Sequence, residues 1–239
     1  MQLDRILQSQ GFGSRKECRK AIREGEVKIG GVVVNDPFQE YDTTDFTFEL
    51  NDWEWEYAEK VYIAMNKPPR YECSHKPKHN ETIYNLLPDP VVLRGAQSVG
   101  RLDVDTTGLL LFSDDGQFIH SISSAKRQVT KSYRATTNQP VDDEQIRKLL
   151  EGVQLVDENE PSRALQAKRV SDKQIELVVD QGQYHLVKRM IAAAGNHVDA
   201  LHRFAVGNLS MEDGSLPELE LGDWCYLRPK HLALLGYNT

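Results

Sequence analysis

The chain has 239 residues, of which 39% are hydrophobic and 27% are charged, a composition typical of globular proteins and unlike that of disordered or collagen-like chains. Apolar runs stay short of the roughly 20 residues that a membrane-spanning helix needs, and residues 1–5 predict no secretory signal. The three cysteines are widely spaced and odd in number. They argue against a disulfide framework and predict a cytoplasmic protein.

The net charge of -7 is unevenly distributed along the chain. Residues 1–30 carry seven Lys and Arg against four Asp and Glu, whereas residues 31–60 carry one against nine. The remainder is nearly neutral. A basic head, an acidic joint and a neutral body predict two domains with different tasks, over residues 1–58 and 59–239.

The head begins with two predicted helices. Leu3, Ile6 and Leu7 share one face of the first. Ser14 and Glu17 have the spacing of a capping box at the start of the second, which a glycine at position 25 ends. A glycine pair at 30–31 then predicts a tight hairpin of strands 27–29 and 32–34.

Five cations spread over one side of the second predicted helix. They are Arg15, Lys16, Arg19, Lys20 and Arg23. A charge run of this kind is usually a solvated helix face. Because few acids interrupt it, we interpret this run as a surface that contacts RNA phosphates.

The head resembles the αL RNA-binding module named after small-subunit ribosomal protein four. The resemblance covers about the first 45 residues and rests on the LDR run at 3–5, the SR pair at 14–15 and the GEVKIGG run at 25–31. Gly30 stands where the module usually has Asn. The resemblance implies that this domain binds RNA.

Residues 36–60 predict a last strand of the head at about 46–50, followed by a short acidic connection. After residue 60, strand-like and helical runs are interspersed without a regular alternation. The predicted strands are 61–65, 109–113, 131–137, 165–170, 174–180 and 197–206. The predicted helices are 81–87, 116–124, 142–151, 184–194 and 229–235. This order predicts an α+β fold.

The most informative stretch is residues 99–112, VGRLDVDTTGLLLF. It predicts a tight loop that leads into a buried strand. Asp103 in such a loop is commonly a turn cap. Alternatively, an Arg-Leu-Asp triplet anchored on an apolar strand holds a carboxylate at the floor of a cleft.

This loop is similar to the catalytic loop of pseudouridine synthases, specifically of the ribosomal small-subunit pseudouridine synthase A family. Further motifs follow in the family's order: NKP at 66–68, YECS at 71–74, SDDG at 113–116, KSY at 131–133, GQYHLVKRM at 182–190, GNHV at 195–198 and LHR at 201–203. Arg70, Gln183 and Leu186 depart from the residues usual there. The resemblance implies a catalytic domain with a mixed, mainly antiparallel sheet, flanking helices and a central cleft.

The resemblance also implies the reaction and the role of Asp103. The enzyme breaks the glycosidic bond of a flipped uridine, rotates the base and rejoins it through C5. Asp103 is the expected catalytic carboxylate, acting as a nucleophile or as a base in a glycal route. Because nothing leaves and nothing is oxidised, we expect neither a cofactor nor a metal.

Four further site residues follow from the resemblance. Lys188 is the expected cation beside Asp103, with Arg189 as the competing choice and otherwise an RNA contact. Tyr133 is expected to pack against the target base, although strand tyrosines are often core residues. Arg101 is expected to contact RNA at the flipped base, and its alternative is a surface ion pair.

Other chemistry-bearing residues carry weaker signals. Cys73, His75 and His79 do not complete a four-ligand zinc set. His120, His185 and His202 are interpreted as RNA-contacting or structural residues rather than general acids.

These observations predict a cytoplasmic, monomeric rRNA pseudouridine synthase. Its expected partner is small-subunit rRNA or an assembly particle that contains it, without membrane attachment. One alternative is a large-subunit rRNA synthase of the same superfamily. Another is a non-catalytic RNA-binding assembly factor.

Overall fold

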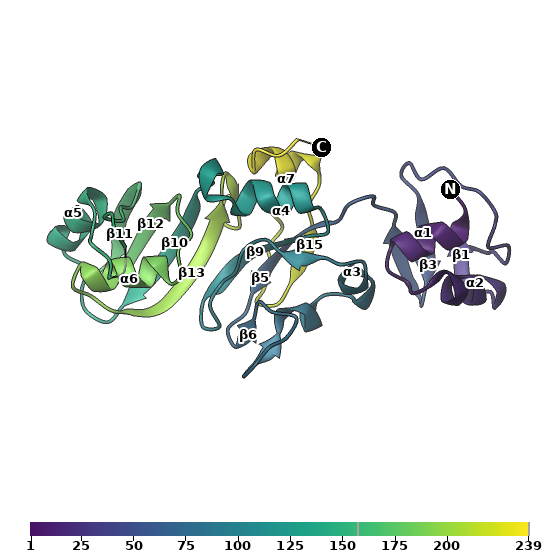
Figure 1. The fold of residues 1–239 in the computed structure, drawn as a ribbon, viewed down its shortest axis with the longest axis horizontal. Helices are drawn as coiled ribbons and strands as arrows, with labels where there is room; N and C mark the ends of the chain where they lie inside the picture. Colours follow the sequence, from purple (N-terminus) through teal and green to yellow (C-terminus); the bar gives the residue numbers. More distant parts are fainter. Residues whose placement is uncertain (157, 239) are drawn as a thin grey trace. The chain divides into compact units, whose positions relative to one another are not determined.

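The computed structural model describes residues 1–156 and 158–238, which form two compact units. One unit comprises residues 1–61 and 87–97, and the other comprises residues 62–86 and 98–239. No helix of the described residues is long and apolar enough to cross a membrane. Figure 1 labels the elements of both units.

The smaller unit confirms the two helices and the hairpin that the sequence predicts. Its elements are α1 (Leu3–Ser9), α2 (Arg15–Arg23), β1 (Val27–Ile29), β2 (Val32–Val33), β3 (Thr47–Leu50), β4 (Trp53–Glu56) and α3 (Asp89–Leu93). The capping box at the start of α2 is present, because Ser14 N donates to Glu17 Oε2 at 2.7 Å and Glu17 N donates to Ser14 Oγ at 3.4 Å. The strands β2, β1, β3 and β4 form an antiparallel sheet in that order.

The expected acidic connection after residue 50 is wrong in part, because Trp53–Glu56 form strand β4 beside β3. Trp55 packs on Phe12 with ring centroids 5.0 Å apart and belongs to the core of this unit. Trp53 is 71% exposed. The alternation of aromatic and acidic residues is a strand pattern, which the acidic composition concealed.

The segment with α3 joins the smaller unit although it lies beyond residue 58 in the sequence. The guanidinium of Arg94 donates to Gln10 Oε1 at 2.9 Å and to the carbonyl oxygens of Ala58 and Glu59 at 2.9 and 3.0 Å. These bonds connect the end of α3 to the end of α1 and to the segment after β4.

The larger unit is built on one mixed sheet with the order β11-β12-β10-β13-β9-β5-β15. Its strands are β5 (Tyr62–Lys67), β9 (Thr107–Ser113), β10 (Lys131–Thr137), β11 (Gln166–Ser171), β12 (Gln174–Val179), β13 (Val198–Val206) and β15 (Trp224–Tyr226). Neighbouring strands run antiparallel except at β13 and β9, which are parallel within the described part of this sheet. The predicted mixed, mainly antiparallel sheet is confirmed.

Helices and short strands complete this unit. The helices are α4 (Gly116–Ser123), α5 (Asp143–Glu151), α6 (Leu186–Ala193) and α7 (Pro229–Leu234), and the short elements are β6 (Tyr71–Glu72), β7 (Glu81–Thr82), η1 (Ile83–Leu86), β8 (Gln97–Ser98, at the boundary of the units), η2 (Ala125–Arg127) and β14 (Leu209–Ser210). The helix expected over 81–87 is wrong in type, since β7 and a 3-10 turn occupy this range.

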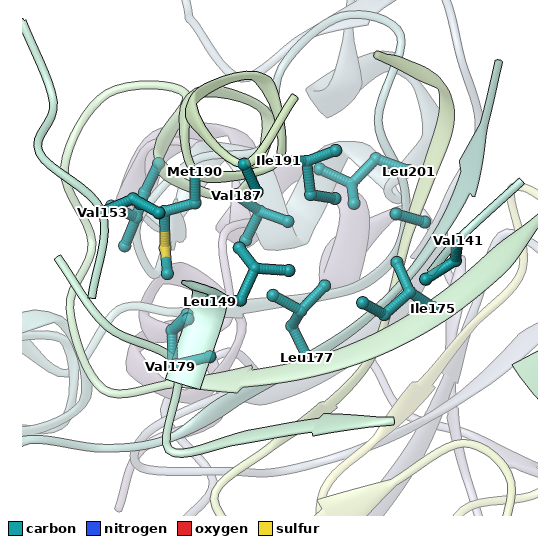
Figure 2. Packing of buried hydrophobic residues seen from close by; sticks show 14 of the residues in the cluster. Val141, Leu149, Val153, Ile175, Leu177, Val179, Val187, Met190, Ile191 and Leu201 are labelled. Carbon is teal, nitrogen blue, oxygen red and sulfur yellow. The ribbon is translucent and has the colours of Figure 1, made fainter. Parts of the chain in front are cut away.

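Two apolar clusters hold the helices against the sheet. In one, α5 and α6 pack on β10 to β13, and Figure 2 shows Val187, Met190 and Ile191 of α6 pointing toward sheet residues that include Leu177. In the other, α4 and α7 pack on Leu109 and other residues of β9 and β5. The first cluster fixes the start of α6, and with it the side chains that face the loop at 99–106.

Candidate active site

The loop at 99–106 enters strand β9 through a close approach of two strands. Gly108 has φ +105°, and a Cβ atom there would lie 2.2 Å from the carbonyl oxygen of Arg203 on β13. Only glycine fits this contact, because any side chain would collide with backbone. Gly108 therefore lets β9 pair with β13 directly after the loop.

A buried lysine donates hydrogen bonds to the backbone of this loop. Lys67 is fully buried, and its Nζ donates to the carbonyl oxygens of Pro68 at 2.9 Å, Thr106 at 3.0 Å and Val104 at 3.4 Å. Burial lowers the pKa of Lys67, while Cys73 and the carboxylates of the loop partly offset this effect. These bonds fix the backbone on both sides of Asp105.

The carboxylate of Asp103 lies between two groups from the start of α6. His185 Nε2 is 3.1 Å from Oδ1 of Asp103, and Lys188 Nζ is 3.5 Å from Oδ2. The Asp103 side chain is 28% exposed. The structure therefore brings Asp103 and Lys188 together, as the resemblance implies.

Lys188 also contacts a second carboxylate. Its Nζ lies 2.7 Å from Oδ1 and 2.8 Å from Oδ2 of Asp105. Burial alone would raise the pKa of Asp105, but the hydrogen bond and charge of Lys188 outweigh it and hold this pKa below its usual value. Lys188 is thus shared between two aspartates of the same loop.

The position of His185 was not anticipated. His185 precedes α6 with φ +51°, and its ring stacks on that of Tyr184 with centroids 3.7 Å apart. Because the backbone of His185 is left-handed and not helical, helical spacing does not predict the direction of its side chain. The contact of His185 with Asp103 is visible only in the structure.

Asp103 opens into a pocket of about 390 Å³. Tyr133 of β10 and Arg101 of the loop line it together with His185. Tyr133 is half-buried, whereas Arg101 is exposed and makes no ion pair among the described residues. Asp103, Tyr133 and Arg101 thus share one cavity, while Lys188 contacts Asp103 without lining it.

Arg189 points elsewhere. Its guanidinium pairs with Glu158 at 3.2 Å and donates to the carbonyl oxygens of Val156 at 2.5 Å and Tyr184 at 3.3 Å. These bonds link α6 to the loop between α5 and β11 and to the residue before His185. The cation beside Asp103 is Lys188 and not Arg189.

The five cations of α2 divide into two groups. Asp4, fully buried, accepts from Arg15 at 3.2 Å and from Arg19 at 2.7 Å. Lys16, Lys20 and Arg23 are exposed. The first group is therefore held by a buried carboxylate. In the second, Lys20 pairs with Glu24 at 3.8 Å on the helix surface, and all three side chains remain accessible to a ligand.

No group of three or more His, Cys, Asp or Glu side chains among the described residues is arranged to hold a metal ion. His75 instead stacks on Tyr84 with ring centroids 3.7 Å apart. Cys73 donates from Sγ to the carbonyl oxygen of Leu102 at 3.5 Å, next to Asp103 in the chain. These side chains support the loop.

Comparisons with known proteins match both parts of the chain. The model of the RNA pseudouridylate synthase family matches residues 61–193, and that of the S4 domain matches residues 1–45. The chain is 37% identical to ribosomal small subunit pseudouridine synthase A of Haemophilus influenzae over 92% of this chain and 94% of that protein. The proteins of the same name from Vibrio cholerae and Escherichia coli K12 are each 34% identical, over 98% and 91% of this chain and 98% and 94% of theirs.

A solved structure described as a pseudouridylate synthase gives the same result. It is 34% identical, aligns with a TM-score of 0.68, and covers 98% of this chain and 99% of its own. The chain therefore belongs to the RNA pseudouridylate synthase family, as a member with an N-terminal S4 domain and near-full-length similarity to ribosomal small subunit pseudouridine synthases A.

Proposed function

We propose that this enzyme converts a uridine of small-subunit rRNA into pseudouridine with Asp103 as its catalytic carboxylate. The observation that carries the proposal is the Asp103 carboxylate in a pocket of about 390 Å³, with Lys188 and His185 at its two oxygens. A cation and a ring nitrogen at these distances orient the carboxylate electrostatically toward the pocket. The names of the near-full-length relatives supply the RNA class.

The chemistry needs one carboxylate beside the sugar. The C1′–N1 bond breaks, and its electron pair leaves with the uracil. Asp103 either bonds to C1′ or removes the C2′ proton, and both routes release the base as an anion. C5 then bonds to C1′, while the Asp103–C1′ bond breaks in the first route or Asp103 returns the proton to C2′ in the second. The C5 proton is lost to water, and N1 takes up a proton.

Tyr133 and Arg101 are assigned to the flipped nucleotide. Tyr133 presents an aromatic side chain within the pocket, suited to packing on the uracil ring. Arg101 is exposed beside Asp103 and is suited to stacking in the space that the base leaves and to phosphate contact. Arg189 remains a proposed RNA contact, but its guanidinium is already bound by Glu158 and by the carbonyl oxygen of Val156, so it is less available to RNA than Arg101.

We assign RNA binding to residues 1–58 and chemistry to residues 59–239. The support is the charge of α2 in the first range and the confinement of the pocket to residues 99–206 in the second. The proposed active form is a monomer. The substrate is naked rRNA or an assembly particle, and the compartment is the cytoplasm, where the free cysteines stay reduced.

Tritium release from C5-labelled uridine tests the function, because the C5 proton is lost to water in this reaction. Small-subunit rRNA, large-subunit rRNA and small-subunit particles are assayed in parallel, and the product is mapped chemically. Release from small-subunit rRNA or its particle supports the proposal. Release from large-subunit rRNA alone identifies the alternative synthase, and binding without release identifies a non-catalytic RNA-binding factor.

A further inference from the structure

Two cations flank Tyr133 on the face of the sheet that lines the pocket. Lys131 lies two residues before Tyr133 on β10, so both side chains leave the same face. Arg203 of β13 is the cross-strand partner of Tyr133, and cross-strand partners also share a face. All three residues line the pocket that contains Asp103.

Neither cation has an acidic partner. Arg203 is only 5% exposed, and its Nε donates to the carbonyl oxygen of Leu109 at 2.8 Å. Among the described residues no carboxylate forms an ion pair with Lys131 or with Arg203. Burial lowers the pKa of Lys131, the charge of Arg203 lowers it further, and Asp180 partly offsets both effects.

On the opposite face of β10, by contrast, a cation has acidic partners. Arg134 pairs there with Glu176 at 2.7 Å and with Glu212 at 2.8 Å. A buried charge without a partner is costly. Two cations in one cavity, Lys131 and Arg203, that lack acidic partners in the described part of the chain therefore indicate that a ligand supplies the negative charge.

We propose that Lys131 and Arg203 contact the carbonyl oxygens of the target uracil and stabilise the negative charge that the base gains when the C1′–N1 bond breaks. The inference rests on the proposed function and adds a binding role for two residues of the same pocket. The departing electron pair spreads from N1 onto O2 and O4, and both catalytic routes generate this anion. Fixed cations at those oxygens act where charge develops, which is the most effective place for them.

The position of the pair favours the base over the sugar-phosphate backbone. Tyr133, the proposed stacking partner of the base, lies between Lys131 and Arg203 on the sheet. Arg203 is almost fully buried, whereas a phosphate stays near solvent, where Arg101 is exposed.

The test combines a protein change with an atomic change in the RNA. Lys131→Met removes the charge and keeps an unbranched side chain, and it leaves the bond from Arg203 to Leu109 in place. Lys168→Met is the matched control, since Lys168 is exposed and pairs across the strands with Glu176, on the face opposite Tyr133. Single-turnover rates are measured at saturating RNA that carries uridine, 2-thiouridine or 4-thiouridine at the target position.

We expect Lys131→Met to slow the single-turnover step by about 10²-fold, the cost of removing one oxyanion donor, and Lys168→Met to leave the rate unchanged. Sulfur accepts hydrogen bonds weakly, so wild type should lose rate with at least one thio-substituted base. Because two changes to one contact are not additive, this penalty should shrink in Lys131→Met.

Three results would overturn the assignment: an unchanged rate in Lys131→Met, equal thio penalties in both proteins at both oxygens, or no thio penalty in wild type. A fourth arm places a neutral methylphosphonate at the target nucleotide, and coupling of Lys131 to that change alone would move the contact to a phosphate and also overturn it. Absence of any isomerisation by wild type on unmodified RNA would instead contradict the proposed function.

Discussion

Lys188 contacts both carboxylate oxygens of Asp105, with its Nζ 2.7 Å from Oδ1 and 2.8 Å from Oδ2. The same ammonium group is 3.5 Å from the nearer oxygen of Asp103. In this structure Asp105 thus binds the ammonium group of Lys188 more closely than Asp103, the proposed catalytic carboxylate, does. The arrangement makes separate predictions for the two aspartates and for the lysine.

Asp103→Asn should abolish isomerisation while the fold and most RNA affinity persist, because an amide is a poor nucleophile and a poor base. Tritium release and a binding measurement on the same RNA check this expectation. Asp105→Asn is the control. It frees Lys188 to move toward Asp103 and should lose far less activity. Full turnover by Asp103→Asn, or loss only in Asp105→Asn, would move the catalytic role along the loop.

Lys188→Met should lower the single-turnover rate of isomerisation of bound RNA by about 10²-fold or more, since it removes the cation that lies 3.5 Å from the Asp103 carboxylate. Arg189→Met is the matched control on the same helix. Because Arg189 binds Glu158 and backbone oxygens, its loss should reduce stability more than chemistry. Single-turnover rates and thermal unfolding of the two variants separate these effects. The reverse pattern would make Arg189 the functional cation.

His185→Asn should slow turnover at saturating RNA by about tenfold, because the shorter side chain does not reach Asp103. Asn tolerates the left-handed backbone at φ +51°, so the start of α6 should be preserved. His120→Asn, on the exposed side of α4, serves as the control. Equal kcat values for wild type and His185→Asn would show that the contact with Asp103 has no part in the reaction.

Replacing Lys16, Lys20 and Arg23 together with Ala should flatten the salt dependence of RNA binding by about two units of slope. These side chains are exposed, and the ion pair of Lys20 with Glu24 at 3.8 Å is a surface pair that a phosphate can replace. Turnover at saturating RNA should stay the same. Replacing Arg147 and Lys148 of α5, which pair with Glu144, is the control and should leave the slope unchanged. An unchanged slope in the triple variant would mean that α2 presents only a solvated face.

Asp4→Asn should destabilise the smaller unit by about 2 kcal/mol at neutral pH, because it removes the charged partner of Arg15 and Arg19. Burial alone would raise the pKa of Asp4, but the hydrogen bonds from the two arginines hold it below its ordinary 3.8. A carboxylate with a lowered folded pKa stabilises above the ordinary value and loses this contribution as pH falls through the folded pKa. The difference between wild type and variant should therefore shrink below pH 3.8.

Urea unfolding checks this pH dependence in a background with Trp53→Phe and Trp224→Phe, so that Trp55 reports on the core of the smaller unit. Asp52→Asn, at an exposed turn, should differ from the background by less than about 0.5 kcal/mol. A difference for Asp4→Asn that persists unchanged below pH 3.8 would contradict the role of its charge.

The helices and long strands were predictable because their signals are local. The capping box of Ser14 and Glu17 and the apolar face of α6 involve residues within one or two helical turns of each other. The element at 81–86 was misassigned, since a run this short is compatible with a strand pair and a 3-10 turn as well as with a helix. The motifs of the loop at 99–112 indicated Asp103, and the order of motifs indicated the family.

The resemblance implied Lys188 as a partner of that carboxylate, but tertiary structure alone showed that His185 is the other. His185 and Lys188 reach Asp103 across about 80 residues of chain, through the register of β10, β13 and β9 and the packing of α6 on the sheet. The same long-range pairing gives Lys188 a second partner in Asp105 and brings Arg203 beside Tyr133. Sequence periodicity determines which face of an element is apolar. The partners of a polar side chain depend on contacts between distant segments, and those contacts form only when the sheet is assembled.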